Sequence, residues 1–127
     1  TNLPGASETA IGTGNQNTTD IENGCITSGT AADICANLTL GGFDDWFLPS
    51  KDELYLMYSN IGQGSSLVNV GGFSNDYYWS STEVGDDDET TVGLASSTDA
   101  WGQGFGSGTQ PNFGKFYTLY VRAVRAF

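Results

Sequence analysis

The first helical pattern along the chain lies between residues 30 and 38 (TAADICANL). Ile34 and Leu38 stand four residues apart, and Ala31 and Cys35 lie beside them, so the apolar positions share one face of a helix about two turns long. A Ser or Thr just before the helix can accept a hydrogen bond from its first turn. We therefore expect a short helix here that packs through Ile34 and its neighbours.

A second helix begins with a stronger signal at Ser50. The run Ser50-Lys51-Asp52-Glu53 is a capping box, in which the Ser hydroxyl accepts from the Glu amide and the Glu carboxylate accepts from the Ser amide. The residues that follow place an apolar stripe on one face of the helix, formed by Leu54, Met57, Tyr58 and Ile61.

Two segments further along have the composition of strands. Residues 77–82 (YYWSST) are aromatic and hydroxyl-rich. Residues 100–105 alternate Trp101, Gln103 and Phe105 with small residues, which is the two-residue period of a strand. A loop follows this second segment. We expect its large side chains to hold one face of a sheet while the intervening glycines present the other face.

The two ends of the chain differ in pattern. Residues 1–29 are rich in Gly, Thr, Asn and Ser and predict a loop-rich arm with at most one short strand. Residues 119–127 (LYVRAVRAF) predict a long final strand. Early helices followed by strands and long loops indicate an α+β fold, and 127 residues without repeats or a linker indicate a single domain over 1–127.

The charge of the chain restricts its partners. With 15 acidic and 4 basic residues the net charge is −11. Such a chain repels phosphate backbones, anionic lipids and sulfated glycans, so we expect neither nucleic acid nor a membrane as a partner. The basic residues are scattered, at Lys51, Lys115, Arg122 and Arg125. No apolar run approaches the roughly 18 residues that insertion as a spanning helix needs.

The absence of His restricts the chemistry in the same way. Without an imidazole the chain cannot perform Ser-His-Asp or Cys-His catalysis or form most zinc sites, so we interpret it as a binding domain and not an enzyme. Cys25 and Cys35 are the only cysteines. A disulfide across that short loop would contribute about 2–3 kcal/mol. Two reduced, buried thiols are the alternative.

Four separated blocks carry a family resemblance. They are residues 32–38, 42–54 (GFDDWFLPSKDEL), 78–82 (YWSST) and 121–125 (VRAVR). In this order they resemble the bacterial domain family named after the C-terminal domain of the Legionella collagen-like adhesin. The resemblance covers roughly residues 28–127.

This resemblance implies a C-type-lectin-like fold, in two short helices packed on small antiparallel sheets with long loops. Related domains sit at the ends of surface and phage proteins, bind ligands without turning them over, and are often trimeric. It therefore implies an extracellular place on a bacterial surface or phage tail and a homotrimer as one form of assembly. The bulky residues of the blocks are expected in the core: Trp46, Leu48, Leu54, Tyr78, Trp79, Val121 and Val124. Arg122 and Arg125 are expected to bind internal carbonyls or carboxylates.

A second resemblance concerns residues 100–127, which look like the variable region of proteins diversified by a reverse-transcriptase retroelement that rewrites template adenines. In that class an AAC codon for Asn changes at its two A positions. The residues reachable in this way are Gly102, Gly104, Gly106, Ser107, Thr109, Pro111, Asn112, Phe113, Gly114, Phe116, Tyr117, Thr118 and Leu119. The residues between them look like fixed scaffold: Trp101, Gln103, Phe105, Gly108, Gln110, Lys115 and Tyr120. An ordinary Gly-rich β region would give similar letters.

The leading hypothesis is a binding domain whose reachable residues, Thr118 excepted, contact a protein or a cell-surface glycan. Phe113, Phe116 and Tyr117 are the expected anchors, because exposed aromatic side chains supply much of an interface's energy. One alternative is a glycan-binding adhesin of fixed specificity. Another is an enzyme of the formylglycine-generating branch of the fold, but that chemistry needs a cysteine pair in the C-terminal half.

Calcium has two weak candidate sites. Gln110-Pro111-Asn112 resembles the sugar-coordinating calcium triplet of animal C-type lectins, but the matching Trp-Asn-Asp triplet is absent. The acidic run at residues 86–89 offers oxygen ligands without EF-hand spacing, as an acidic solvated loop also would. Asp44 and Asp45 have no acid–base partner in the sequence pattern and are interpreted as turn residues. We therefore expect no cofactor, with Ca²⁺ as the weaker alternative.

Overall fold

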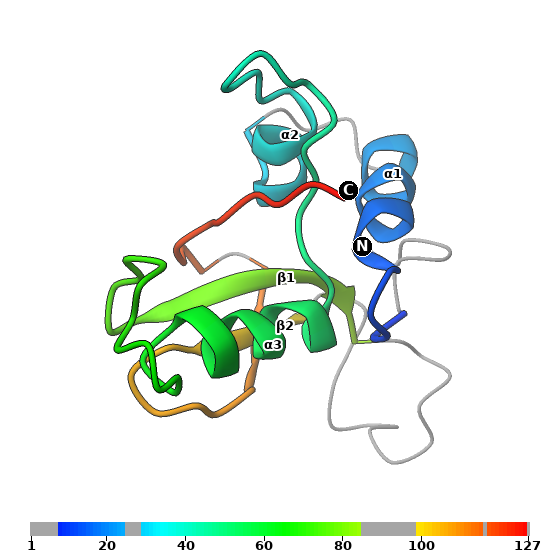
Figure 1. The fold of residues 1–127 in the computed structure, drawn as a ribbon. Helices are drawn as coiled ribbons and strands as arrows, with labels where there is room; N and C mark the ends of the chain where they lie inside the picture. Colours follow the sequence, from blue (N-terminus) through cyan, green and yellow to red (C-terminus); the bar gives the residue numbers. More distant parts are fainter. Residues whose placement is uncertain (1–7, 25–28, 85–98, 116, 127) are drawn as a thin grey trace.

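The computed structural model describes residues 8–24, 29–84, 99–115 and 117–126. Within these ranges it contains helices α1 (Gly14–Gly24), α2 (Ala31–Ala36) and α3 (Lys51–Ile61), and strands β1 (Tyr77–Glu83), β2 (Asp99–Gly104) and β3 (Asn112–Gly114). The strands form one antiparallel sheet in the order β1-β2-β3. Helix α3 lies along the sheet, and α1 and α2 stand together above the sheet in the view of Figure 1, on the side away from α3. The mixed α+β prediction is confirmed.

The predicted helix starts are confirmed by their caps. Thr30 precedes α2 and accepts a hydrogen bond from the Asp33 amide at 3.2 Å. Ser50 and Glu53 form the predicted capping box at the start of α3. Helix α2 buries Ala32 and Cys35, however, while Ile34 is 52% exposed. The prediction that Ile34 packs in the core is therefore wrong, because α2 packs on Leu48 through Ala32 and Cys35, with Ala31 beside them.

Helix α1 corrects the prediction of a loop-rich arm over residues 1–29. It has almost no apolar side chains, so no hydrophobic stripe marks it in the sequence. Buried polar contacts hold it instead. The Thr18 hydroxyl accepts the Leu48 N–H at 3.0 Å, and the Asn17 amide donates to the Glu8 carbonyl at 2.7 Å. Both side chains are buried.

The C-terminal segment corrects the prediction of a long final strand over residues 119–127. Tyr120 forms a single parallel bridge to Tyr78, and Val124 forms a single antiparallel bridge to Phe47. The C-terminal segment thus pairs one residue with β1 and one residue with the segment before α3. The described residues of this segment therefore form no continuous β-ladder. In Figure 1 this red segment crosses beneath α2 and ends beside α1.

Two apolar clusters form the core. The first joins α3 to the sheet through Leu54, Phe73, Tyr78 and Phe105, with the Phe73 and Phe105 rings stacked at 4.1 Å. The second joins α2 to Leu48 and the C-terminal segment. Among the residues predicted as core, Leu48, Leu54, Tyr78 and Trp79 are buried, and Trp46, Val121 and Val124 are half-buried.

The Glu53 carboxylate ties the N-terminal segment to α3. It accepts the backbone N–H groups of Gly12 at 3.1 Å, Gly14 at 3.0 Å and Ser50 at 2.8 Å. Charged acceptors of this kind form the stronger hydrogen bonds of proteins. The Ser50 hydroxyl adds a bond to the Ala10 carbonyl at 2.9 Å. One side chain therefore caps α3 and fixes the start of α1.

Gly14→Ala tests this junction. A Cβ at Gly14 would lie 2.2 Å from Glu53 Oε1, 2.8 Å from the Ser50 nitrogen and 2.9 Å from the Leu48 oxygen. Although Ala normally favours a helix by about 1 kcal/mol, the clash with backbone should reduce the free energy of unfolding by about 2–3 kcal/mol. Urea denaturation measures the change. Gly106→Ala is the control, since its Cβ would meet nothing closer than 3.5 Å. Equal stabilities for the two variants would contradict this account of the junction.

Cys35 is a buried free thiol, and burial raises its pKa to about 12. Cys25, the other half of the predicted disulfide, lies outside the described residues. In the reduced native protein we expect iodoacetamide at pH 8 to label Cys35 at least about a hundredfold more slowly than in urea, because little thiolate forms and access is blocked. Peptide mass spectrometry gives both rates. Equally fast labelling in the two states would show that this thiol is accessible. The intact mass of the unreduced protein reports separately on a bridge.

Candidate functional site

The large side chains of β2 face α3, as the alternating pattern predicts. Phe105, just after the strand, packs on Leu54 in the core, and Gln103 is fully buried. The Lys51 ammonium lies 3.8 Å from the centre of the Trp101 ring. Gly102 and Gly104 consequently lie on the opposite face of the sheet.

That opposite face is not open at its two glycines. Gly102 and Gly104 are buried, so the prediction that they are exposed contacts is wrong. A Cβ at Gly102 would lie 3.3 Å from the Phe113 ring, and one at Gly104 would lie 3.0 Å from the Tyr77 ring. The two glycines make room for aromatic rings that lie over the strand. The outer surface here belongs to the covering side chains.

The other predicted contacts are placed as follows. Phe116 lies outside the described residues. Gly106, Ser107, Thr109 and Tyr117 are exposed, while Pro111, Asn112, Phe113, Gly114 and Leu119 are half-buried. The hydroxyl oxygens of Ser107 and Thr109 share a hydrogen bond at 2.8 Å. The predicted contact residues therefore divide between the turn after β2 and the segment after β3.

Phe113 is the centre of an aromatic cluster on this face. Its ring meets Tyr77 at 5.2 Å, Trp79 at 6.2 Å and Tyr117 at 6.1 Å between centroids, each edge to face. Tyr117 remains 54% exposed at the end of the cluster. Edge-to-face contacts of this kind add about 0.5–1.5 kcal/mol each beyond burial. Tyr117 is thus an exposed aromatic side chain that packs against the half-buried Phe113 ring.

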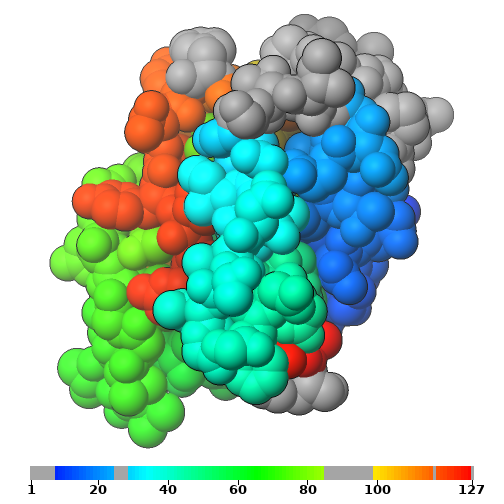
Figure 2. All heavy atoms as spheres, turned by 90° about the horizontal axis from the view of Figure 1, so that it is seen from above, coloured from blue at the N-terminus to red at the C-terminus, as the bar shows by residue number. Residues whose placement is uncertain are grey.

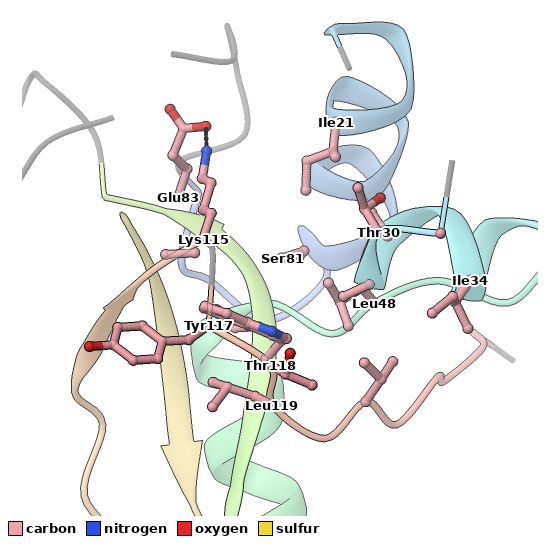
Figure 3. A pocket seen from close by; sticks show the side chains of 17 residues that line it. Ile21, Thr30, Ile34, Leu48, Ser81, Glu83, Lys115, Tyr117, Thr118 and Leu119 are labelled. Atoms are coloured by element: carbon pink, nitrogen blue, oxygen red, sulfur yellow. Dashed lines mark hydrogen bonds and ion pairs between the residues drawn. The ribbon is translucent and has the colours of Figure 1, made fainter. Parts of the chain in front are cut away.

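A pocket of about 460 Å³ lies beside this cluster, between α2, β1 and the C-terminal segment (Figure 3). Its lining is mainly apolar. The residues are Ile21, Gly29, Thr30, Ala31, Ala32, Ile34, Leu48, Trp79, Ser80, Ser81, Glu83, Ala100, Lys115, Tyr117, Thr118, Leu119 and Val121. Only Tyr117 and Leu119 among them were predicted contacts. The sequence carried no signal for the α2 wall, because the pattern around Ile34 is that of an ordinary buried helix face.

An ion pair marks one end of the pocket. Lys115 Nζ lies 2.6 Å from Glu83 Oε2, with Glu83 only 3% exposed and Lys115 31% exposed. A buried carboxylate requires such a partner, since leaving it without one would cost several kcal/mol, on the order of 3–5. Lys115 therefore has a structural role, which agrees with its prediction as fixed scaffold.

A smaller hollow of about 280 Å³ lies between α1, the end of α2 and residues 44–46. It is lined by Asn15, Thr18, Thr19, Glu22, Asn23, Ala36, Asp44, Asp45 and Trp46. Burial, followed by the charge and a hydrogen bond of Asp33, raises the pKa of Glu22. The lining of this hollow is polar apart from Ala36 and the Trp46 indole, whereas the larger pocket also has Ile, Leu and Val side chains.

The two C-terminal arginines bind groups of the protein itself, as predicted. Arg125 donates to both oxygens of Asp45, at 2.6 and 3.0 Å, and its guanidinium lies 3.6 Å from the centre of the Phe43 ring. The hydrogen bond from Arg125 holds the pKa of Asp45 below its usual value. Arg122 donates to the Gly71 carbonyl at 3.0 Å.

In the described residues the structure shows no cluster of metal-binding side chains at the predicted calcium positions. Among the residues described, no group of three or more acidic, Cys or His side chains converges as a metal site would. The Gln110 amide donates to the Lys51 carbonyl at 3.0 Å. The acidic run at residues 86–89 lies outside the described ranges. No helix in the described part of the chain is long and apolar enough to span a bilayer.

Comparison with known proteins gives one finding. The family model described as the Lcl C-terminal domain matches residues 7–125, almost the whole chain. No curated protein and no solved structure gave a match. Lcl C-terminal domains are C-type-lectin-like, non-catalytic domains of adhesin type, so the predicted fold family is confirmed. The chain belongs to the Lcl C-terminal domain family.

Proposed function

We propose that this chain is an extracellular ligand-binding domain of adhesin type, whose contact surface lies in residues 106–119. The observation that carries the proposal is the exposed Tyr117 ring, supported by Phe113 and placed at the rim of the 460 Å³ pocket. A fixed aromatic anchor next to a concave, mainly apolar surface is the usual centre of an interface.

The surface is organised before any ligand arrives. Phe113 is held by Tyr77 and Trp79 of β1, and Lys115 by Glu83 of the same strand. Because these side chains already have their places, binding costs less conformational entropy than it would on a mobile loop. The net charge of −11 favours neutral or basic ligands over sulfated ones. The ligand class is a protein or a cell-surface glycan.

A glycan-binding adhesin of fixed specificity is the second candidate. The polar hollow beside α1 favours it, because Trp46 offers an indole ring and Asn15 and Asn23 offer amides. Amides can bond neighbouring sugar hydroxyls while a ring covers the apolar face of a sugar. This site lies apart from residues 106–119.

Screening on glycan and protein arrays, followed by Tyr117→Ala, tests the leading proposal. We expect Tyr117→Ala to weaken binding to the hits at least about tenfold, because it removes the anchor. Leu67→Ala is the control, since Leu67 is 61% exposed and lies outside this surface. Hits that bind both variants equally well would argue against this surface. A set of hits confined to sulfated glycans would contradict the charge argument.

We further propose that residues 102–119 are diversified by a retroelement. The proposal is supported by the interleaving of reachable positions with Trp101, Gln103 and Phe105, which lie toward the core side of β2. A Cβ at Gly102 would crowd the Phe113 ring at 3.3 Å, and one at Gly104 would crowd the Ser107 hydroxyl at 2.7 Å and the Tyr77 ring at 3.0 Å, so variation should be most frequent from position 106 onward.

The DNA around the gene decides this point. We expect a near-copy of the final coding bases beside a reverse-transcriptase gene, with differences confined to template adenines. A neighbourhood with neither feature, or differences spread over all four bases, would refute diversification. The binding proposal would remain, with a fixed specificity.

A further inference from the structure

The apolar wall of the larger pocket includes a helix residue that does not pack in the core. Ile34 is 52% exposed, although its neighbours Ala32 and Cys35 are buried against Leu48. Across the pocket stand Leu119 and Val121 of the C-terminal segment, and Ile21 of α1 forms a further part of the wall. Figure 3 shows Ile21, Ile34 and Leu119 around one hollow, contributed by elements far apart in the sequence.

We propose that this pocket binds uncharged apolar side chains of a protein ligand. The inference rests on the proposed function, since Tyr117 and Leu119 belong to both surfaces, and it selects protein over glycan as the ligand class at this site. Figure 2 shows α2 and the C-terminal segment side by side on one face, where a single ligand can reach both.

Three hydroxyl groups of the pocket already form hydrogen bonds within the protein, which disfavours a sugar. Thr30 accepts the Asp33 amide at 3.2 Å, the Ser80 hydroxyl donates to the Trp101 carbonyl at 2.6 Å, and Ser81 accepts from the Asn17 amide at 3.4 Å. Each of these three hydroxyls therefore already has at least one partner within the protein. Within the described part of the chain no Asn or Gln lines the pocket, so its described wall offers no side-chain amide to bind sugar hydroxyls.

The charges of the pocket argue against an ionic ligand. Among the residues that the structure describes, Glu83 and Lys115 are its only charged lining residues, and they bind each other at 2.6 Å. A ligand carboxylate would have to compete with the buried Glu83 for the Lys115 ammonium, which is unfavourable. An apolar group leaves the pair intact and is drawn in by the removal of apolar surface from water.

The size of the pocket sets the shape of the ligand. About 460 Å³ falls within the roughly 300–1,000 Å³ of ordinary ligand pockets and exceeds what one side chain fills. Two large apolar residues on one face of a ligand helix, three or four positions apart, would fit this description. Tyr117, whose ring points away from the pocket in Figure 3, would pack beside such a segment.

Small uncharged probes test the proposal on the full 127-residue chain. We expect N-acetyl-tryptophanamide and N-acetyl-leucinamide to shift the NMR amide signals of Ile34, Ser81 and Leu119 saturably, while methyl glucoside shifts none of them. Ile34→Ser should weaken the binding of N-acetyl-tryptophanamide at least about fivefold, because it removes apolar wall. Ile34 is exposed, so the variant should fold, and the dispersion of its NMR spectrum checks this. Val70→Ser, also at an exposed Val outside the pocket, should bind as the parent does.

Each other outcome overturns the inference. Absence of saturable shifts at these amides, equal binding by Ile34→Ser, or a preference for the glucoside would remove the pocket as a site for apolar side chains. The proposed function is tested separately by Tyr117→Ala. If Tyr117→Ala loses array hits while Ile34→Ser keeps both the hits and the probe, the binding domain stands and the pocket proposal fails.

Discussion

The hydrogen bonds of the Glu53 carboxylate are the constraint that positions the N-terminal helix α1 in the fold. By accepting the amides of Gly12, Gly14 and Ser50 the carboxylate fixes where α1 begins relative to α3. Helix α1 has too few apolar residues to hold itself against the core by hydrophobic burial. Its position, and hence the place of Ile21 in the pocket wall, follows from this junction and from the buried bonds of Thr18.

The face of the sheet that carries Gly102 and Gly104 depends on the lack of side chains at these two positions. Without a Cβ at Gly102 and Gly104, the rings of Phe113 and Tyr77 can lie against β2. Phe113 then supports Tyr117 at the surface. The two glycines allow aromatic rings to cover β2, and the proposed contact surface therefore lies on the segment after β3 and not on the strand itself.

The pocket forms where elements distant in the sequence meet without filling the space between them. Helix α2 turns its small residues inward and leaves Ile34 outside, while the C-terminal segment pairs with β1 and with Phe47 in turn. The Glu83–Lys115 pair closes one end and cancels its own charge. An acidic domain thus presents a neutral, mainly apolar hollow beside an aromatic anchor, which suits a protein ligand better than an anionic polysaccharide.

The sequence by itself determined the elements whose signals are local: the capping box at Ser50, the helix before Asn37, the strand at 77–82 and the alternation of Trp101, Gln103 and Phe105. Motif order also indicated the family, which the match over residues 7–125 confirms. Only the tertiary structure decided the rest. Helix α1 is held by long-range polar bonds, the C-terminal strand pattern is divided between two partners, and the exposure of Ile34 and burial of Gly102 depend on which neighbours cover them. None of these has a period along the chain, because their causes lie in contacts between residues far apart in sequence.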